Sequence, residues 1–373
     1  MATETENCAP RARVLAALSH RQPERVPFSW GFGPTAEMQV ILREQLARQG
    51  IDWDRLARAV NDKIGVGPAY IGKPGENGWG IKTKTADYGG GSYQEFTDFP
   101  LGSLSEAAQL RDYPWPSADP FDYTGLPEAI RKANPGMRLA VSLGGGNPFE
   151  IYCWMTGLET AMMNMLSAPE LVTAALDRIT GHMETVLERS LKAAGDLVDM
   201  IFFADDLGTQ NGLMISRQAY REIIQPFHRR LCDCARKHAP RATRMLHSDG
   251  AVFEILPDLM DAGVQMLEAV QTDAAGMDPQ RLKNAYGKTL SFQGAISVQH
   301  LLPHTDEKTV DRECRRLVEI LGRDGGYIAA PAHAIQVGTP VANVLAMLRA
   351  VLGEQDYARG LANAAIPPGT GRS

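Results

Sequence analysis

The sequence predicts an α/β protein, a (β/α)₈ TIM-like barrel with an N-terminal extension and a glycine-rich insert. From residue 138 onward, five β-then-α units follow one another, each with a short apolar strand, as in parallel sheets with helical crossovers. Polar residues recur just after these strands, at the ends that form the active-site mouth of a barrel. A doubly wound sheet fits the same alternation, but no glycine-rich dinucleotide fingerprint follows a strand.

The first part of the chain is less regular. Residues 11–19 have helical periodicity, and residues 25–29 should be extended. The segment 65–102 is expected to form a long excursion, a small hairpin insert, over the barrel mouth, with its glycine run 89–91 opposing regular structure. Pro114, Pro116 and Pro120 predict a stiff extended connection.

The later elements justify the barrel prediction one by one, because apolar strands and amphipathic helices alternate along the chain. Their expected order is strand 138–142, ending in Gly144–Gly146; helices 148–155, 157–166 and 169–194; strand 200–203, loop 204–212 and helix 216–238; strand 243–246 and helix 252–261; strand 265–268 and helix 278–286; strand 290–294 and helix 309–321; and strand 326–330 and helix 341–351.

Length and composition indicate one globular domain, 1–373, with an N-terminal segment and insert over 1–136, regular units over 137–353 and a tail over 354–373. Hydrophobic residues make up 44% of the chain and charged residues 22%, enough for a large core. The net charge of −6 opposes nucleic-acid binding. The polar N-terminus has no signal-peptide core, and no run reaches the ~18 apolar residues of a membrane span, so a cytoplasmic protein is expected.

The five cysteines are too few and too scattered for a disulfide framework, and they are interpreted as structural thiols. Cys232 and Cys234, two positions apart in a helical stretch, would point in divergent directions, which disfavours shared metal binding. The five are Cys8, Cys153, Cys232, Cys234 and Cys314.

Two histidines stand at strand ends. His247 and Asp249 follow the strand 243–246, and His333 follows the last strand. An imidazole and a carboxylate on one strand-end turn could bind a metal or share a proton, although His247 could also simply hydrogen-bond its neighbour. We predict that His247 and His333 are metal ligands and that Asp249 is catalytic.

Adjacent acids follow the strand 200–203. One of Asp205 and Asp206 could face the barrel lumen while the other caps the loop, and paired carboxylates can shift each other's pKa for proton transfer. The alternative is a helix cap together with a loop salt bridge. Both acids are predicted to be catalytic.

Further polar side chains are expected to bind substrate. The turn 143–150 is rich in glycine and opens a helix, so it could admit a ligand close to the backbone, but it lacks the pattern of a nucleotide-binding loop. Glu268 and Gln271 also follow a strand, whereas His300 and His304 are interpreted as surface residues. The predicted substrate-binding residues are Asn147, Glu150, Gln210, Gln293 and Gln336.

These segments, taken together, resemble the uroporphyrinogen decarboxylase / corrinoid methyltransferase superfamily. The resemblance covers nearly the whole chain in consistent order and is strongest over 198–345. It rests on residues 12–27 with His20-Arg21-Gln22-Pro23, on Asp205-Asp206-Leu207-Gly208, on 220–226, on the His247 turn, on 258–271, on 292–296 and on 325–343.

The resemblance implies a (β/α)₈ barrel and two competing branches. Decarboxylases grip their polycarboxylate substrate with an arginine-rich N-terminal motif, but residues 27–33 contain no arginine here, and Asp62 poorly matches the essential aspartate. Zinc-dependent methyltransferases use His-x-Cys and a second Cys. This chain has Asp249 in place of the first Cys and His333 near the second, a harder set that can still hold zinc. A metal-free acid/base site is the other possibility.

The resemblance therefore favours a methyltransferase or demethylase that moves a methyl group between cobalamin, carried by a corrinoid protein partner or substrate, and a small molecule. A methoxylated compound, a thiol or a folate would be the acceptor or donor. The first alternative is a decarboxylase-like lyase for a smaller carboxylic acid, and the second is a non-catalytic tetrapyrrole- or corrinoid-binding protein. A homodimer is also expected, because barrels of this family often pair.

Overall fold

The computed structural model describes residues 9–73, 78–87 and 91–367. The chain forms two compact units. The first comprises Met1–Ile64, Arg138–Ala140 and Glu268–Ser373, and the second comprises Gly65–Met137 and Val141–Leu267. The chain passes from one unit to the other inside strands β1 (Lys63–Val66) and β9 (Met266–Val270) and again near residues 137–141. Each unit is an α/β structure with parallel strands.

In the second unit the parallel strands β6 (Ala140–Gly146), β7 (Met200–Ala204) and β8 (Thr243–His247) are neighbours in that order. The helices α6 (Pro148–Thr156), α7 (Leu158–Ser167) and α8 (Pro169–Ala194) connect β6 to β7. The short helix α9 (Arg217–Ala219), a π-helical turn (Tyr220–Ile224) and α10 (Gln225–His238) connect β7 to β8, and α11 (Leu256–Asp261) follows. These are the predicted β-then-α units, and their parallel pairing is confirmed.

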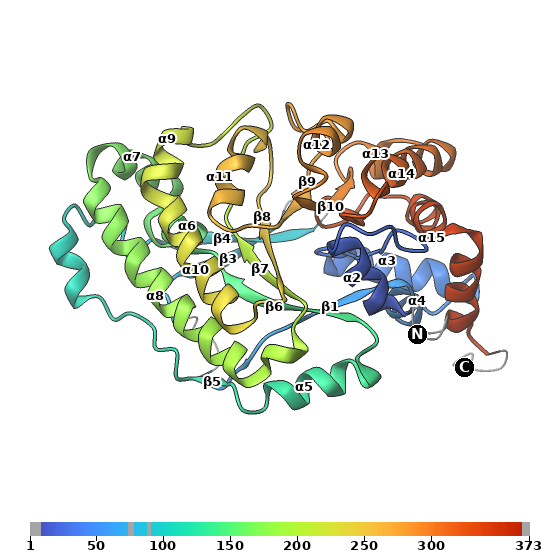
Figure 1. The fold of residues 1–373 in the computed structure, drawn as a ribbon, viewed down its shortest axis with the longest axis horizontal. Coiled ribbons are helices and arrows are strands. Elements are labelled where there is room, and N and C mark those ends of the chain that lie inside the picture. Colours follow the sequence, from blue (N-terminus) through green and yellow to red (C-terminus); the bar gives the residue numbers. More distant parts are fainter. Residues whose placement is uncertain (1–8, 74–77, 88–90, 368–373) are drawn as a thin grey trace. The chain divides into compact units, whose positions relative to one another are not determined.

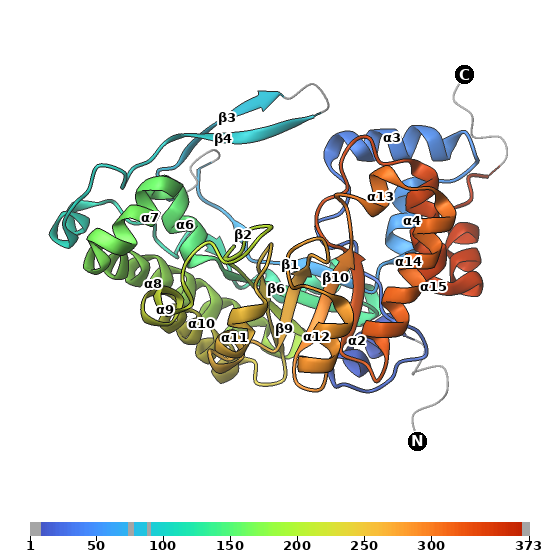
Figure 2. The same cartoon turned by 90° about the horizontal axis from the view of Figure 1, so that it is seen from above.

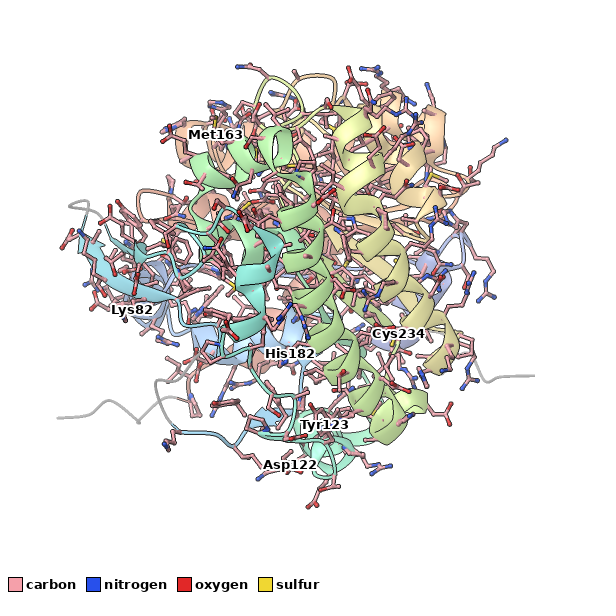
Figure 3. All side chains as sticks on the ribbon, turned by 90° about the vertical axis from the view of Figure 1, so that its left-hand side faces the viewer. Lys82, Asp122, Tyr123, Met163, His182 and Cys234 are labelled. Atoms are coloured by element: carbon pink, nitrogen blue, oxygen red, sulfur yellow. The ribbon has the colours of Figure 1, made fainter. Side chains whose placement is uncertain are left out.

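The helical layer of this unit is built around α8 and α10, which lie side by side (Figures 1 and 3). Buried leucine, isoleucine and valine side chains of α8 recur at helical spacing, so one face of this helix enters the core. Cys234, labelled on α10 in Figure 3, lies with its Sγ 3.8 Å from the carbonyl oxygen of Glu184 on α8.

An antiparallel hairpin of β3 (Lys82–Asp87) and β4 (Ser92–Asp98) occupies the glycine-rich segment, seen clearly in Figure 2. The expected hairpin is therefore present, although Gly89 and Gly90 of the glycine run lie outside the described residues. A 3₁₀ helix (Ala107–Asp112) follows, and the proline-rich stretch after it, predicted as an extended connection, forms neither helix nor strand before β5. Then β5 (Phe121–Asp122) pairs with β2 (Ala69–Tyr70), and α5 (Leu126–Ala133) and a 3₁₀ turn (Pro135–Met137) lead to β6.

In the first unit, β10 (Ser291–Ile296) and β11 (Tyr327–Pro331) are parallel neighbours, and β9 precedes β10 in the strand order. The extended segment predicted at 25–29 runs parallel to β11, since the amide of Ser29 donates to the carbonyl of Ala329 and the amide of Ala329 donates to Pro27. The helices are α2 (Pro10–Leu18), α3 (Ala36–Ala47), α4 (Trp53–Val60), α12 (Pro279–Tyr286), α13 (Leu301–His304), α14 (Glu307–Gly322) and α15 (Val341–Ala364).

The structure adds helices that the pattern did not predict. The helices α3, α4 and α5 are each 12 residues or fewer, and α15 continues to Ala364, through the region predicted as a tail. Gly353, with φ +76°, interrupts α15 near the predicted end, and the chain then resumes a helical course. The predicted helix 341–351 therefore ends close to this break, and the helical segment after Gly353 was not predicted.

Strand β6 also runs further than predicted, through the glycines at 144–146. A Cβ built on Gly145 would lie 2.3 Å from a ring carbon of Phe203 on β7, so only glycine allows this close approach. The four cysteines in the described part of the chain are buried and free, in agreement with structural thiols. Within those same residues, no helix is both long and apolar enough to cross a membrane.

Candidate metal centre and active site

The register of the second unit brings two strand ends together. Ala204, the last residue of β7, pairs with His247, the last residue of β8, so the acids after β7 lie beside the His247 turn. The amide of Asp205 donates to the carbonyl of His247 at 3.1 Å. The amide of Leu207 donates to Ser248 Oγ at 2.9 Å. The two loops are therefore held by direct hydrogen bonds.

Two glycines allow these loops to interlock. A Cβ on Gly208 would lie 2.6 Å from the carbonyl oxygen of Asp249, and Gly250 adopts φ +81° with its missing Cβ directed at Thr209. The amide of Ala251 also donates to the carbonyl of Thr209 at 2.8 Å. Larger residues at either glycine would push the loops apart, and the acidic side chains on them would separate.

Asp206, His247 and Asp249 form one compact group. Each offers a ligand atom, and these atoms all lie within 4.8 Å of one another. His247 Nε2 is 3.5 Å from Asp206 Oδ1 and 3.7 Å from Asp249 Oδ1. The imidazole is buried and the carboxylates are half-buried, and the amide of Asp249 donates to Asp206 Oδ1 at 2.8 Å. This hydrogen bond orients one carboxylate toward the histidine.

The geometry fits a small divalent cation. Zinc bonds to imidazole nitrogen and carboxylate oxygen at about 2.0–2.2 Å, so tetrahedral ligands lie roughly 3.3–3.6 Å from one another. The separations of 3.5 and 3.7 Å from His247 Nε2 lie close to that range, and the ligand atoms of Asp206 and Asp249 lie within 4.8 Å of each other. Three protein ligands with a fourth position open is the pattern of catalytic rather than structural zinc sites.

Asp205 has a different environment from its neighbour. Its carboxylate is fully buried and accepts hydrogen bonds from the amides of Phe149 and Glu150, at the N-terminus of α6. It also lies 2.7 Å from His228 Nε2, and His228 Nδ1 contacts the hydroxyl of Tyr220 at 3.1 Å. Burial raises the pKa of Asp205, and His228 and the helix amides oppose that rise. Asp205 thus anchors α6 beside the cluster.

Glu150, in the first turn of α6, has an unusual carboxyl group. Burial, with Asp205 and Asp206 nearby, raises the pKa of Glu150 to about 7, although a hydrogen bond from Asn147 Nδ2 to Oε2 at 3.1 Å acts in the opposite direction. A carboxyl group that titrates near neutrality can hold or release a proton during a reaction. Asn147 and Glu150, both predicted as substrate-binding residues, therefore lie together.

A cavity of about 410 Å³ adjoins the cluster within the same unit. Among the described residues, its polar lining consists of Glu95, Glu150, Asp206 and the thiol of Cys153, with no lysine, arginine or histidine. Asp206 belongs to both the cavity wall and the metal-binding group. The apolar lining is formed by Phe96, Phe99, Phe149, Trp154, Leu158 and Met214.

The remaining predicted site residues are spread over both units. Gln210 is exposed on the loop after β7. Gln336 and His333 follow β11 in the first unit; Gln336 is exposed, and the ring of His333 lies 4.9 Å from the ring of Phe32. Gln293 on β10 is buried, and its Oε1 accepts no hydrogen bond from the described residues. His333 and His247 belong to different units, and their predicted convergence in one pocket stays a prediction. Within the second unit, the compact group contains Asp206 as its third member.

Sequence reasoning missed His228, Tyr220 and the aromatic cavity wall. Tyr220 and His228 are eight positions apart in the segment predicted as one helix, and both are buried there. A histidine on the apolar face of that helix was the available signal, because a buried imidazole needs a polar partner.

Asp62 has a structural environment in the first unit. It is buried, pairs with Arg13 at 2.6 Å and Arg25 at 3.0 Å, and accepts a hydrogen bond from the amide of Phe28 at 2.8 Å. A carboxylate that is paired with two guanidinium groups holds the N-terminal segment in place. These contacts agree with the poor match of Asp62 to a catalytic aspartate.

Comparison with known proteins identifies the family of the chain and a solved structure with the same fold. Over 249 residues the chain is 26% identical to a methylated-thiol–coenzyme M methyltransferase of Methanosarcina mazei. The alignment covers 64% of this chain and 61% of the relative, so the chain spans less than two thirds of the length of that relative. A solved methyltransferase from Methanosarcina mazei shares the fold, with a TM-score of 0.63 and 18% identity over 92% of this chain and 98% of that one. Residues 89–353, more than half of the chain, match the model of one family, and the chain therefore belongs to the uroporphyrinogen decarboxylase (URO-D) family.

Proposed function

We propose that this chain is a methyltransferase or demethylase that moves a methyl group between a corrinoid and a small substrate. The carrying observation is the group Asp206, His247 and Asp249 at the edge of a cavity whose described lining has no basic side chain. A substrate with many carboxylates, as the decarboxylase branch would need, would find no lysine, arginine or histidine side chain among the described lining residues. The names of the two similar proteins agree with methyl transfer.

Asp206, His247 and Asp249 would hold a metal, which we propose to be zinc. A bound zinc ion lowers the pKa of a water, alcohol or thiol and withdraws charge from it. One nitrogen and two carboxylate oxygens form a harder donor set than thiolates, which favours an oxygen-containing substrate. His333 is proposed as a further site residue supplied by the first unit.

The other side chains have separate tasks in this proposal. Glu150 holds a proton near the cavity and can give it to a leaving oxygen, because its pKa is raised to about 7. Asp205 acts as a positioning residue, since it fixes the start of α6, from which Glu150 extends. Gln210, Gln293 and Gln336 are proposed to contact the substrate or the corrinoid.

We also propose that the parallel strands close into a (β/α)₈ barrel. The amide of Asp62, next to β1, donates to the carbonyl of Phe28 at 2.9 Å, while Ser29 pairs with β11. The segment at 27–29 thus has hydrogen-bonded neighbours on both sides, as the eighth strand of a barrel would. A corrinoid protein partner and a homodimer complete the proposal.

Methyl transfer is the decisive test. The purified chain is incubated with methylcobalamin and with a panel of alcohols, thiols and folates, and in the reverse direction with methoxylated donors and reduced cobalamin. Metal content is measured in parallel by elemental analysis of protein purified without chelators. We expect transfer with at least one substrate, and loss of both transfer and zinc in His247→Ala.

A matched control is His300→Ala, because His300 is an exposed histidine of the first unit. Its transfer rate and metal content should equal those of the unchanged chain. No transfer across the whole panel would contradict the proposal. Carbon dioxide release from a small acid would support the lyase alternative instead, and spectral binding of cobalamin without turnover would support the binding-protein alternative.

A further inference from the structure

The cavity beside the metal-binding group has walls from two separate elements. Phe149, Cys153 and Trp154 lie on α6. Phe149 and Cys153, four positions apart, share one face of the helix, and Trp154 shares the neighbouring face with Glu150, four positions before it. Phe96 lies on β4 of the hairpin, and its ring stacks with the ring of Trp154 at a centroid distance of 5.5 Å and an interplanar angle of 26°. Two aromatic planes therefore lie nearly parallel in the cavity wall.

The hairpin side of the cavity is tied to α6 by the backbone. The amide of Leu101 donates to the carbonyl of Met155 at 2.8 Å. A Cβ on Gly102 would lie 3.1 Å from the carbonyl oxygen of Thr156, so the chain passes very close to the end of α6. These contacts hold Phe99, which precedes Leu101, at the cavity rim.

Large apolar side chains remain open to solvent at that rim. Phe99 is 41% exposed and Leu158 is 53% exposed, whereas Phe149 deeper in the cavity is 1% exposed. Exposed apolar side chains that continue into an apolar cavity indicate a surface that a ligand covers. The volume of 410 Å³ lies within the ~300–1,000 Å³ of small-molecule sites.

The charges in the wall select against ionic ligands. An anion would find no cationic side chain among the lining residues that the structure describes. A cation would find little free charge, because Glu95 pairs with Lys84 at 2.9 Å and Asp206 belongs to the metal-binding group. Burial also favours the neutral form of Glu150. An uncharged ligand fits this wall best.

We infer that the cavity bounded by Phe96, Phe99, Phe149 and Trp154 binds an uncharged aromatic methyl ether, with its ring against the aromatic wall and its ether oxygen toward Asp206 and Glu150. Stacked and edge-on aromatic contacts explain a preference for a ring over an aliphatic chain. The inference rests on the proposed function and names its substrate class.

The reaction balances as follows. The methyl carbon leaves the ether oxygen without the bonding electron pair, and a Co(I) corrinoid supplies the pair that forms its new bond. The oxygen keeps the original pair as a phenolate and takes one proton, from Glu150 or from solvent, to become a phenol. The aromatic ring itself is neither oxidised nor reduced.

Binding is tested separately from turnover. Isothermal titration of the full chain, with and without added zinc, compares 1,2-dimethoxybenzene with three probes: phenyltrimethylammonium as a cation, 3,4-dimethoxybenzoate as an anion and 1,2-dimethoxyethane as an ether without a ring. We expect the neutral aromatic ether to bind, and each of the other three to bind at least about tenfold more weakly. Tighter binding of the cation, of the anion or of the ringless ether would overturn the inference, as would failure of the neutral ether to bind.

Variants locate the site. Trp154→Leu and Phe96→Leu should each weaken binding of dimethoxybenzene by about three- to tenfold, since each removes an aromatic contact. Tyr93→Leu is the matched control, because Tyr93 lies on the same strand, is 54% exposed and does not line the cavity. Thermal unfolding confirms that each variant is folded. Because the chain has five tryptophans, the part of the ligand-induced fluorescence quenching that is lost in Trp154→Leu gives a second readout. Equal binding by all three variants would refute the placement.

The two proposals fail in different ways. If dimethoxybenzene binds at this wall but no methyl group is transferred with reduced corrinoid, the proposed function is wrong and the assignment of the ligand class stands. If methyl groups are transferred from aliphatic donors only and no aromatic ether binds, the proposed function stands and the substrate inference is wrong.

Discussion

Replacing His228 with phenylalanine should strongly destabilise the second unit. The substitution keeps an aromatic ring of similar size but removes the nitrogen that lies 2.7 Å from Asp205 Oδ2, in a pair that is almost completely buried. A hydrogen bond to a charged group contributes about 1.5–3 kcal/mol, and leaving a buried carboxylate without its partner costs about 3–5 kcal/mol in total. Asp205 keeps two amide donors from α6, so we expect a loss near 3 kcal/mol.

Urea denaturation followed by circular dichroism measures this loss as a lower unfolding midpoint. The double variant His228→Phe with Asp205→Asn should be less destabilised than His228→Phe alone, because the asparagine oxygen still accepts from one of the two α6 amides and no buried charge is left. A loss below about 1 kcal/mol in the single variant, or a double variant that is no better than the single one, would refute a paired Asp205 carboxylate.

Three further predictions follow from the same unit. Asp206→Ala, in protein purified without chelators, should lower zinc content from about one ion per chain toward zero by elemental analysis, and retained zinc would exclude the cluster as the metal site. The raised pKa of Glu150 means that the folded state binds the proton more tightly, so its contribution to stability is present below about pH 4.5 and is lost as pH rises through about 7. In the metal-free Glu150→Gln variant, the free energy of unfolding measured by urea titration should no longer show this dependence on pH between 4.5 and 7. An unchanged pH dependence would contradict the raised pKa of Glu150. Gly208→Ala should reduce the melting temperature and the affinity for zinc, because its Cβ would lie 2.6 Å from the carbonyl of Asp249, and wild-type values for both would refute the interlocked loops.

Much of the fold could be predicted from the sequence. Strands β7, β8, β10 and β11 and the helices α8 and α10 show strong apolar periodicity, and their burial confirms what that periodicity indicates. The helices α3, α4 and α5 were missed because each is short and lies outside the repeating β/α rhythm. The start of α4 carried a signal that was available, since the side chain of Asp52 caps it by accepting from the amide of Arg55.

The site was predictable in part. Strand-end position indicated Asp206, His247 and Asp249, and parallel register explains why they meet. The sequence indicated that one of Asp205 and Asp206 could face the site while the other held a loop, but it did not show which. Nothing in the sequence shows that the carboxylate of Asp205 meets the first amides of α6. The stacking of Phe96 on Trp154 joins residues 58 positions apart across irregular chain, and no local pattern encodes such a contact.

Because the hairpin of β3 and β4 is a separate element, ligand preference can change independently of metal binding. The metal-binding group is held by the loops after β7 and β8, whereas Phe96 of the aromatic wall comes from a two-stranded element with its own hydrogen-bond ladder, and Phe99 follows that element directly. Random substitution at Phe96 and Phe99 would thus alter ligand preference while zinc content and the stability of the sheet stay unchanged. Evolution can use the same independence, exchanging hairpin residues among relatives to redirect one chemistry toward new compounds.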